Sequence, residues 1–218
     1  GSEDSFAGAA MLTDARLLLF PVKSVKGVFA WATCPFALGR FASDLEMLGQ
    51  DKVAKTLREL TEGLKGLEEK ALVGEGSSLL MGSDIVLEEF KFSAETNGYI
   101  NSLAGELVEL FLSFKETQWH ASKLSESLVV LPDSEFEHFA RHSTEVITRI
   151  KIDNKPGTVA KGALLNEEYV PVDAVFYSMS FLRKEFFPKA KEKAAFSGGD
   201  DEAKSFYTEH FLPQQTIQ

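Results

Sequence analysis

The sequence predicts an α+β fold, for which a ferredoxin-like sheet with helices on one face is the natural candidate. Two observations carry this prediction. Strand and helix patterns alternate along the first part of the chain, and short apolar strands then gather into hairpins. With 218 residues, of which 44% are hydrophobic and 26% charged, the chain is long enough for one large domain with a buried core.

The first segments predict a strand and then a long helix. Residues 14–20 form an apolar run that predicts a buried strand stopped by Pro21. Beyond it, apolar residues recur at helical spacing, with Ser24 as the N-cap, Pro35 as a kink and Gly49 as the end. These apolar residues are Val25, Phe29, Ala32, Phe36, Phe41, Leu45 and Leu48.

The middle of the chain continues the alternation of helices and strands. Spacing and turn residues predict an amphipathic helix over 50–67, a strand pair over 71–73 and 79–81, a strand over 85–92, and a helix over 99–114. A short strand over 128–131 precedes a helix over 134–142, in which Ser134 and Glu137 have the spacing of a capping box.

Hairpins dominate the predicted structure of the last third. Residues 145–152 alternate as a strand should, and 153–157 form a strong turn signal. Further strands are predicted over 163–165 and 174–181, followed by a basic exposed stretch over 183–193, a loop over 197–201 and a helix over 203–211.

Charge is unevenly distributed along the chain. The net charge of −10 and a pI near 5.0 argue against a free-standing nucleic-acid binder. Two segments are nevertheless basic: Lys23 and Lys26 have no acid near them, and four bases between 147 and 162 face the single acid Asp153. This pattern fits RNA binding on one face and protein packing on others, or a solvated sheet edge, which composition alone favours.

Motifs for catalysis or metal binding are absent from the sequence. No P-loop, nucleophile elbow or Cys–His metal spacing occurs, so we predict no catalytic residue and no metal ligand. His138 and His142 have the i,i+4 spacing of two metal ligands, but a solvated helix face is the preferred interpretation. The single Cys34 and the lack of a signal peptide or membrane span predict a soluble, cytoplasmic protein.

Two long stretches carry a family resemblance. The first is Phe-Pro-Val-Lys-Ser-Val-Lys-Gly-Val-Phe-Ala-Trp, residues 20–31. The second runs from Thr144 through Arg149-Ile-Lys-Ile, Gly157-Thr-Val and Gly162-Ala-Leu to Glu167-Glu-Tyr-Val-Pro. Together they resemble the fourth subunit of the type III-B CRISPR (Cmr) complex, a RAMP protein, and the resemblance covers the chain beyond Gly8.

The resemblance implies a RAMP palm, ferredoxin-like and RRM-like, with helical insertions and a β-hairpin thumb at 148–171. Residues 9–218 would form a single, incomplete RAMP domain, and residues 1–8 a flexible segment or tag remnant. Copies would stack head to tail with other Cmr subunits along guide RNA, and each thumb would splay the guide–target duplex. Thumb bases Arg149, Lys151, Lys155 and Lys161 would contact phosphates, while Lys23, Ser24 and Lys26, at a helix N-terminus, would meet the guide backbone.

The resemblance also implies an activity that this chain is not expected to carry. Family members cleave target RNA in antiviral defence with an Asp and a divalent metal such as Mg²⁺, but nothing here matches that segment. We therefore expect the chain to be truncated at both ends, with no catalytic residue and no cofactor of its own. The alternatives are a protein interaction scaffold without RNA binding and a nuclease that uses another acid. We expect self-association through uncovered sheet edges and apolar surface.

Overall fold

The computed structural model describes residues 10–64, 70–111, 118–153 and 158–182. The chain forms two compact units, one over Ala15–Tyr177 and one that combines Gly1–Asp14 with Ser178–Gln218. In the second unit, the described residues form an antiparallel ribbon of β1 (Ala10–Leu12) and β11 (Ser180–Leu182). The predicted segments 1–8, 183–193, 197–201 and 203–211 lie outside the described residues.

The larger unit contains a mixed seven-stranded sheet in the order β10-β2-β3-β7-β4-β6-β5. The strands in this sheet are β2 (Arg16–Lys23), β3 (Phe29–Thr33), β4 (Lys70–Val73), β5 (Asp84–Leu87), β6 (Phe90–Thr96), β7 (Leu128–Val130) and β10 (Val175–Tyr177). Two pairs, β3–β7 and β4–β6, are parallel, and the other neighbours are antiparallel.

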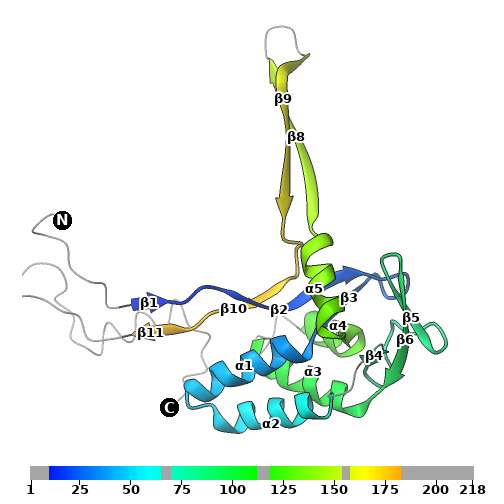
Figure 1. Cartoon of the computed structure of the whole chain (residues 1–218), viewed down its shortest axis with the longest axis vertical. Helices are drawn as coiled ribbons and strands as arrows, with labels where there is room; N and C mark the ends of the chain where they lie inside the picture. Colours follow the sequence, from blue (N-terminus) through cyan, green and yellow to red (C-terminus); the bar gives the residue numbers. More distant parts are fainter. Residues whose placement is uncertain (1–9, 65–69, 112–117, 154–157, 183–218) are drawn as a thin grey trace, which may run out of the picture. The chain divides into compact units, whose positions relative to one another are not determined.

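Helices and one long hairpin complete this unit (Figure 1). The helices are α1 (Pro35–Met47), α2 (Asp51–Glu62), α3 (Gly98–Phe111), α4 (Gln118–Ser127) and α5 (Asp133–His142), and the hairpin is β8 (Glu145–Asp153) with β9 (Thr158–Tyr169). The predicted α+β class is confirmed. None of the described helices has the length and hydropathy that crossing a bilayer requires.

The sheet is buried on both faces. Along β3, Trp31 packs in a core shared with α1 to α4, whereas its neighbours Ala30 and Ala32 pack in a second core with α5. Along β7, Leu128 and Val130 belong to the first core and Val129 to the second. Successive side chains of a strand point to opposite faces, so strands covered on both sides consist almost entirely of apolar residues.

The predicted helix from Val25 is wrong in its first half. Residues 25–28 form a turn, Phe29–Thr33 is strand β3, and the helix α1 begins only at Pro35. Proline suits the first turn of a helix because its missing N–H would be unsatisfied there anyway. Gly49, with a φ of +75°, follows the helix as predicted.

The prediction that Pro21 stops its strand is also wrong, because β2 continues to Lys23. On one side, Pro21 pairs with Trp31 of β3. On the other side, the pairing of β10 with β2 reaches only from Arg16 to Leu19. Pro21 therefore lies where β2 has no β10 neighbour to receive an N–H, and such positions tolerate proline.

Three smaller predictions also need correction, and one helix was missed. Residues 79–81 do not form a strand, and 85–92 divides into β5 and β6 at a turn where Glu88 has a φ of +50°. Helix α5 begins at Asp133 after Pro132 and has no side-chain cap at its N-cap, so the Ser134 capping box does not form. Helix α4 was not predicted. The helices α2 and α3 and the strands β4, β7 and β8 are confirmed.

Candidate nucleic-acid interface

The β2–β3 turn carries the first group of predicted RNA-binding residues, but not at a helix N-terminus. The Ser24 N–H donates to the Val28 carbonyl at 3.0 Å, and the Val25 N–H donates to the Val86 carbonyl of β5 at 3.2 Å. These two backbone N–H groups are therefore occupied within the protein. The prediction of a helix N-terminus that offers free N–H groups to phosphate is wrong, because β2 turns back directly into β3.

The three predicted side chains of this turn differ in their contacts. The Ser24 hydroxyl donates to the Val86 carbonyl at 3.2 Å, and the Lys26 ammonium donates to the Leu80 carbonyl at 2.7 Å. The Lys23 ammonium is exposed and has no hydrogen-bond or ion-pair partner among the described residues. Of the three, Lys23 is thus the cation most available to an external anion.

The β8–β9 hairpin carries the second group. The side chains of residues 145–152 are all exposed, and the strands pair from Glu145–Tyr169 to Asp153–Thr158, with a register shift at Lys151. A two-stranded ribbon of this length, exposed on both faces, cannot bury a core of its own. Its surfaces are therefore available to a ligand or a partner.

Arg149 is neutralised within the hairpin. Its guanidinium contacts the Glu167 carboxylate at 2.7 Å, donates to the Tyr169 hydroxyl at 2.6 Å and lies over the Tyr169 ring. Tyr169 in turn donates to Glu167, and this hydrogen bond is the main cause of the raised pKa of the tyrosine. A phosphate that binds Arg149 must compete with Glu167 for the same guanidinium.

The remaining predicted bases have different standing in the structure. Lys151 is exposed and has no ion pair with a described residue. Lys161 belongs to strand β9, whereas Lys155 lies outside the described residues.

A hollow of about 650 Å³ lies at the root of the hairpin. It brings Lys23 and Phe29 together with the end of α5, the start of β8 and the segment that follows β9. The lining residues are Pro21, Lys23, Phe29, Glu88, His142, Ser143, Thr144, Glu145, Val146, Ile147, Pro171, Val172 and Asp173. The two stretches that resemble the Cmr family thus meet at one surface.

The contacts of two side chains important for this surface, Trp31 and Lys123, were missed by the sequence reasoning. The Trp31 indole donates to the Asp173 carbonyl at 2.8 Å and so ties β3 to the segment after the hairpin. Lys123 of α4 donates to the Gly27 carbonyl and lies over the Phe29 ring, 4.9 Å from its centroid. No spacing pattern reveals such contacts, because each depends on segments that are distant in sequence.

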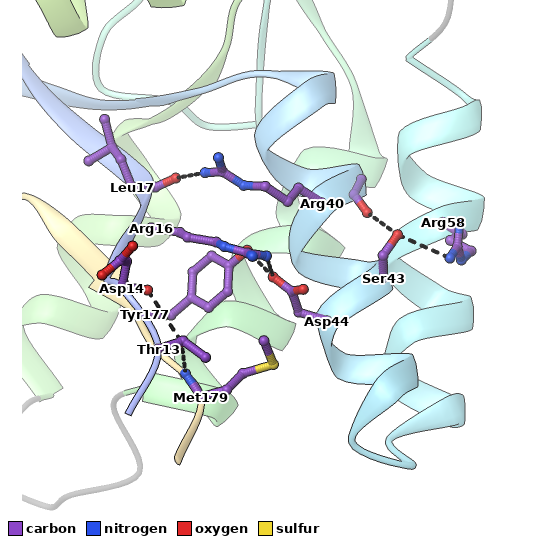
Figure 2. A network of polar contacts seen from close by, with 11 residues as sticks. Thr13, Asp14, Arg16, Leu17, Arg40, Ser43, Asp44, Arg58, Tyr177 and Met179 are labelled. Atoms are coloured by element: carbon purple, nitrogen blue, oxygen red, sulfur yellow. Dashed lines mark hydrogen bonds and ion pairs between the residues drawn. The ribbon is translucent and has the colours of Figure 1, made fainter. Parts of the chain in front are cut away.

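The buried carboxylate of Asp44 has a structural role. Figure 2 shows Arg16 and Tyr177 pointing toward it, with the Arg16 guanidinium at 2.5 Å and the Tyr177 hydroxyl at 2.7 Å. The same figure shows Arg40 donating to the Leu17 carbonyl at 2.9 Å. The network joins β2, α1 and β10, and Asp44 already accepts two hydrogen bonds, which suits a structural anchor.

Metal-ligand clustering does not occur in the described part of the chain. The rings of His138 and His142 lie 4.6 Å apart, but no three His, Cys, Asp or Glu side chains come together there. The described residues therefore offer no ligand cluster for a divalent cation of the kind that the family resemblance implies, and no catalytic step through a metal is derived from them.

Comparison with known sequences identifies relatives. Residues 1–208 match the RAMP superfamily. The CRISPR system Cmr endoribonuclease Cmr4 of Pyrococcus furiosus is 32% identical over 188 residues, which cover 85% of this chain and 58% of the relative. The CRISPR system CMR subunit Cmr4 of Saccharolobus solfataricus is 28% identical over 190 residues, covering 82% and 60%. The chain thus spans less than two thirds of the length of these relatives.

Solved structures share the fold. A chain of the type III-B Cmr-beta complex bound to cognate target RNA superposes with a TM-score of 0.65 at 18% identity, covering 97% of this chain and 65% of that chain. The crystal structure of Pyrococcus furiosus Cmr4 (Cas7) gives a TM-score of 0.60 at 24% identity, covering 93% and 63%. The family match and the Pyrococcus furiosus relative confirm the predicted family resemblance, and the solved structures are consistent with the ferredoxin-like palm.

Proposed function

The chain belongs to the RAMP superfamily, and we propose that it is a backbone subunit of a CRISPR RNA-guided effector complex that binds guide RNA along its sugar–phosphate backbone. The observation that carries the proposal is the hollow at the hairpin root. It gathers Lys23 of β2, Thr144 and residues 145–147 of β8 around one surface. Backbone-led recognition of this kind positions the RNA and carries little base preference.

Among the predicted residues, Lys23, which lines the hollow, and Lys151, which lies further along β8, are the strongest candidates for phosphate contacts. Both ammonium groups are exposed, and neither has an ion-pair partner among the described residues. A cation that is free in the protein releases counterions from RNA without first breaking a protein contact. We also propose phosphate contacts for Lys26, Ser24, Lys155 and Lys161. Arg149 would contact phosphate once its guanidinium leaves the Glu167 carboxylate.

The hairpin at 145–169 would act as the thumb that shapes the guide–target duplex. Its pairing places Val146 and Ile150 on one face, with Leu164 opposite Ile150, and Ile152 follows beyond the register shift at Lys151. All four are more than half exposed. Apolar side chains on a protruding ribbon suit insertion between stacked bases or packing against a second protein.

Assembly is a second proposed role, favoured by this apolar strip of Val146, Ile150, Ile152 and Leu164. The structural relatives include a crystal structure of oligomeric Cmr4 from Pyrococcus furiosus. We propose that copies of this chain pack head to tail, with other Cmr subunits as further partners. Replacement of Ile150 and Ile152 by serine should lower the weight-average mass in light scattering. The control, Met47→Ser on α1, should not.

Target cleavage is assigned to no residue of this chain. The Pyrococcus furiosus relative is named an endoribonuclease, and a divalent metal such as Mg²⁺ is proposed for that activity in the whole protein. We also propose a cytoplasmic location, where the guide and target RNA would be met.

The binding experiment uses the full chain, labelled single-stranded guide-like RNA and a series of salt concentrations. Lys23→Gln and Lys151→Gln should each weaken binding and reduce the slope of log K against log salt by about 0.7. The control is Lys55→Gln, since Lys55 is an exposed lysine on α2, far from the hollow in sequence. A pure interaction scaffold would show no binding at any salt, and equal slopes for all variants would remove these two lysines from the interface.

A further inference from the structure

The β2–β3 turn is strained. Its backbone has positive φ at two successive residues, +82° at Gly27 and +73° at Val28. The Phe29 N–H donates back to the Gly27 carbonyl at 3.0 Å, which closes a γ-turn centred on Val28. A β-branched residue in this conformation is unfavourable and persists only where its surroundings fix it.

The Gly27 carbonyl is the atom of the turn that a side chain of another element, α4, contacts. Besides the Phe29 N–H, this oxygen accepts a hydrogen bond from the Lys123 ammonium of α4. A charge-assisted hydrogen bond to a carbonyl is stronger than a neutral one. A side chain at position 27 would also be obstructed, since a Cβ there would lie 3.0 Å from the Ser78 hydroxyl.

Lys123 is an unusual choice for this position because it is only partly exposed. Burial lowers the pKa of its ammonium, and the nearby Glu126 only partly offsets the effect. The Phe29 ring below it provides a cation–π contact, and the same Phe29 lines the hollow at the hairpin root. The ammonium of Lys123 thus stays at a position where burial disfavours its charge, and there it holds the Gly27 carbonyl of the turn.

The side chains that the turn leaves exposed face outward from a fixed backbone. Val28 is 80% exposed and Val25 is 65% exposed. The Lys26 ammonium contacts the Leu80 carbonyl, and Ser24 contacts β5 through Val86. The turn is thus held by α4, by β5 and by the loop that precedes β5.

We propose that Lys123 is a positioning residue for RNA binding: from α4 it fixes the Gly27 carbonyl and the left-handed Val28, so that the β2–β3 turn meets the RNA backbone in one preformed conformation. The inference rests on the proposed function for its RNA part. The bracing of the turn by Lys123 is a separate claim and is measured without RNA.

The experiment compares Lys123→Met, Lys123→Arg and the control Lys55→Met in the full chain. Methionine keeps an apolar side chain over Phe29 but cannot donate to Gly27, whereas arginine keeps the donor. Hydrogen exchange followed by NMR reports on the Ser24, Val25 and Phe29 amides. In Lys123→Met these amides should exchange about tenfold faster, while Lys123→Arg and the control keep their protection.

The second measurement is the affinity for guide-like RNA across salt, under conditions where all variants are folded. Lys123→Met should bind about tenfold more weakly with an unchanged salt slope, because the phosphate contacts are still made once the turn is ordered. Lys123→Arg should restore most of the affinity.

Three outcomes overturn the inference. If Lys123→Met reduces the slope of log K against log salt by about 0.7, Lys123 is a direct phosphate ligand and not a positioning residue. Unchanged amide exchange would show that Lys123 does not hold the turn. A loosened turn with unchanged affinity would separate the turn from RNA binding. If the unmodified chain binds no RNA, the proposed function fails and the positioning role with it, whereas the amide exchange still decides whether Lys123 braces the turn.

Discussion

The indole N–H of Trp31 donates a 2.8 Å hydrogen bond to the backbone carbonyl of Asp173. Trp31 lies in the buried strand β3, and Asp173, with a φ of +74°, lies in the turn between β9 and β10. One side chain thus anchors the exposed hairpin to the sheet. Asp173 also lines the hollow at the hairpin root, so we expect the geometry of the root to depend on this contact.

Trp31→Phe should destabilise the fold and loosen the hairpin root. Phenylalanine retains an aromatic ring but leaves the Asp173 carbonyl without its donor, a loss of about 1 to 3 kcal/mol. Urea denaturation measures the loss of stability. Hydrogen exchange at the Ala174 amide, which bonds to the Pro171 carbonyl, measures the root directly. An Ala174 amide that stays as protected as before would show that the turn does not need Trp31.

Glu167→Gln should strengthen RNA binding. Glu167 neutralises Arg149 at 2.7 Å, and its replacement frees the guanidinium and removes a negative charge from the hairpin. Stability should change little, since both side chains are substantially exposed and exposed pairs contribute little. RNA affinity across salt is the measurement, and Glu137→Gln, which breaks the exposed Arg141 pair on α5, is the matched control. Equal or weaker binding by Glu167→Gln would argue against Arg149 as a phosphate ligand.

Asp44→Asn should destabilise the larger unit. The fraction of folded protein that binds RNA at saturating RNA concentration should not change. The buried Asp44 carboxylate accepts from both Arg16 and Tyr177, and the loss of hydrogen bonds to a charged group costs about 1 to 3 kcal/mol. A double-mutant cycle with Tyr177→Phe in urea denaturation should give a coupling energy well above zero. Additive effects would mean that the two side chains do not act as one network.

Cys34 should make stability depend on alkaline pH. Burial raises the pKa of its thiol from an ordinary 9.0 to about 12, so the folded protein disfavours the thiolate. A raised pKa contributes stability that is complete below pH 9 and is lost as pH rises toward about 12. The difference in unfolding free energy between wild type and Cys34→Ser should shift against the wild type across this window. A difference that stays constant with pH would contradict the raised pKa.

The sequence prediction of the fold failed mainly in the region from Val25 to Leu48. Strand β3 is buried on both faces, so it shows no polar–apolar alternation, and its apolar residues Phe29 and Ala32 also fit a helical spacing. The available signals for a different structure were Gly27 at a turn and Pro35 at the first position of a helix. Helix α4 was missed because only Leu124 of its described side chains lies in the core.

The candidate site was only partly predictable for a similar reason. The local basic character of Lys23, Lys26 and Lys151 is visible in the sequence, because it needs no tertiary information. The neutralisation of Arg149 by Glu167 follows from the pairing register of β8 with β9, which places Ile147 opposite Glu167 and Arg149 next to it. The contact of Lys123 with Gly27 depends on how α4 packs against β3, and no local pattern encodes it.

The measurement that tests the central claim most directly is ultraviolet crosslinking of guide-like RNA to the full chain, followed by mapping of the crosslinked peptides. A single RNA-binding surface formed by the β2–β3 turn and the hairpin predicts crosslinks in two segments, residues 23–29 and 144–153, both reduced in the Lys23→Gln, Lys151→Gln double variant. Crosslinks confined to the α1–α2 face, or unaffected by the double variant, would contradict it.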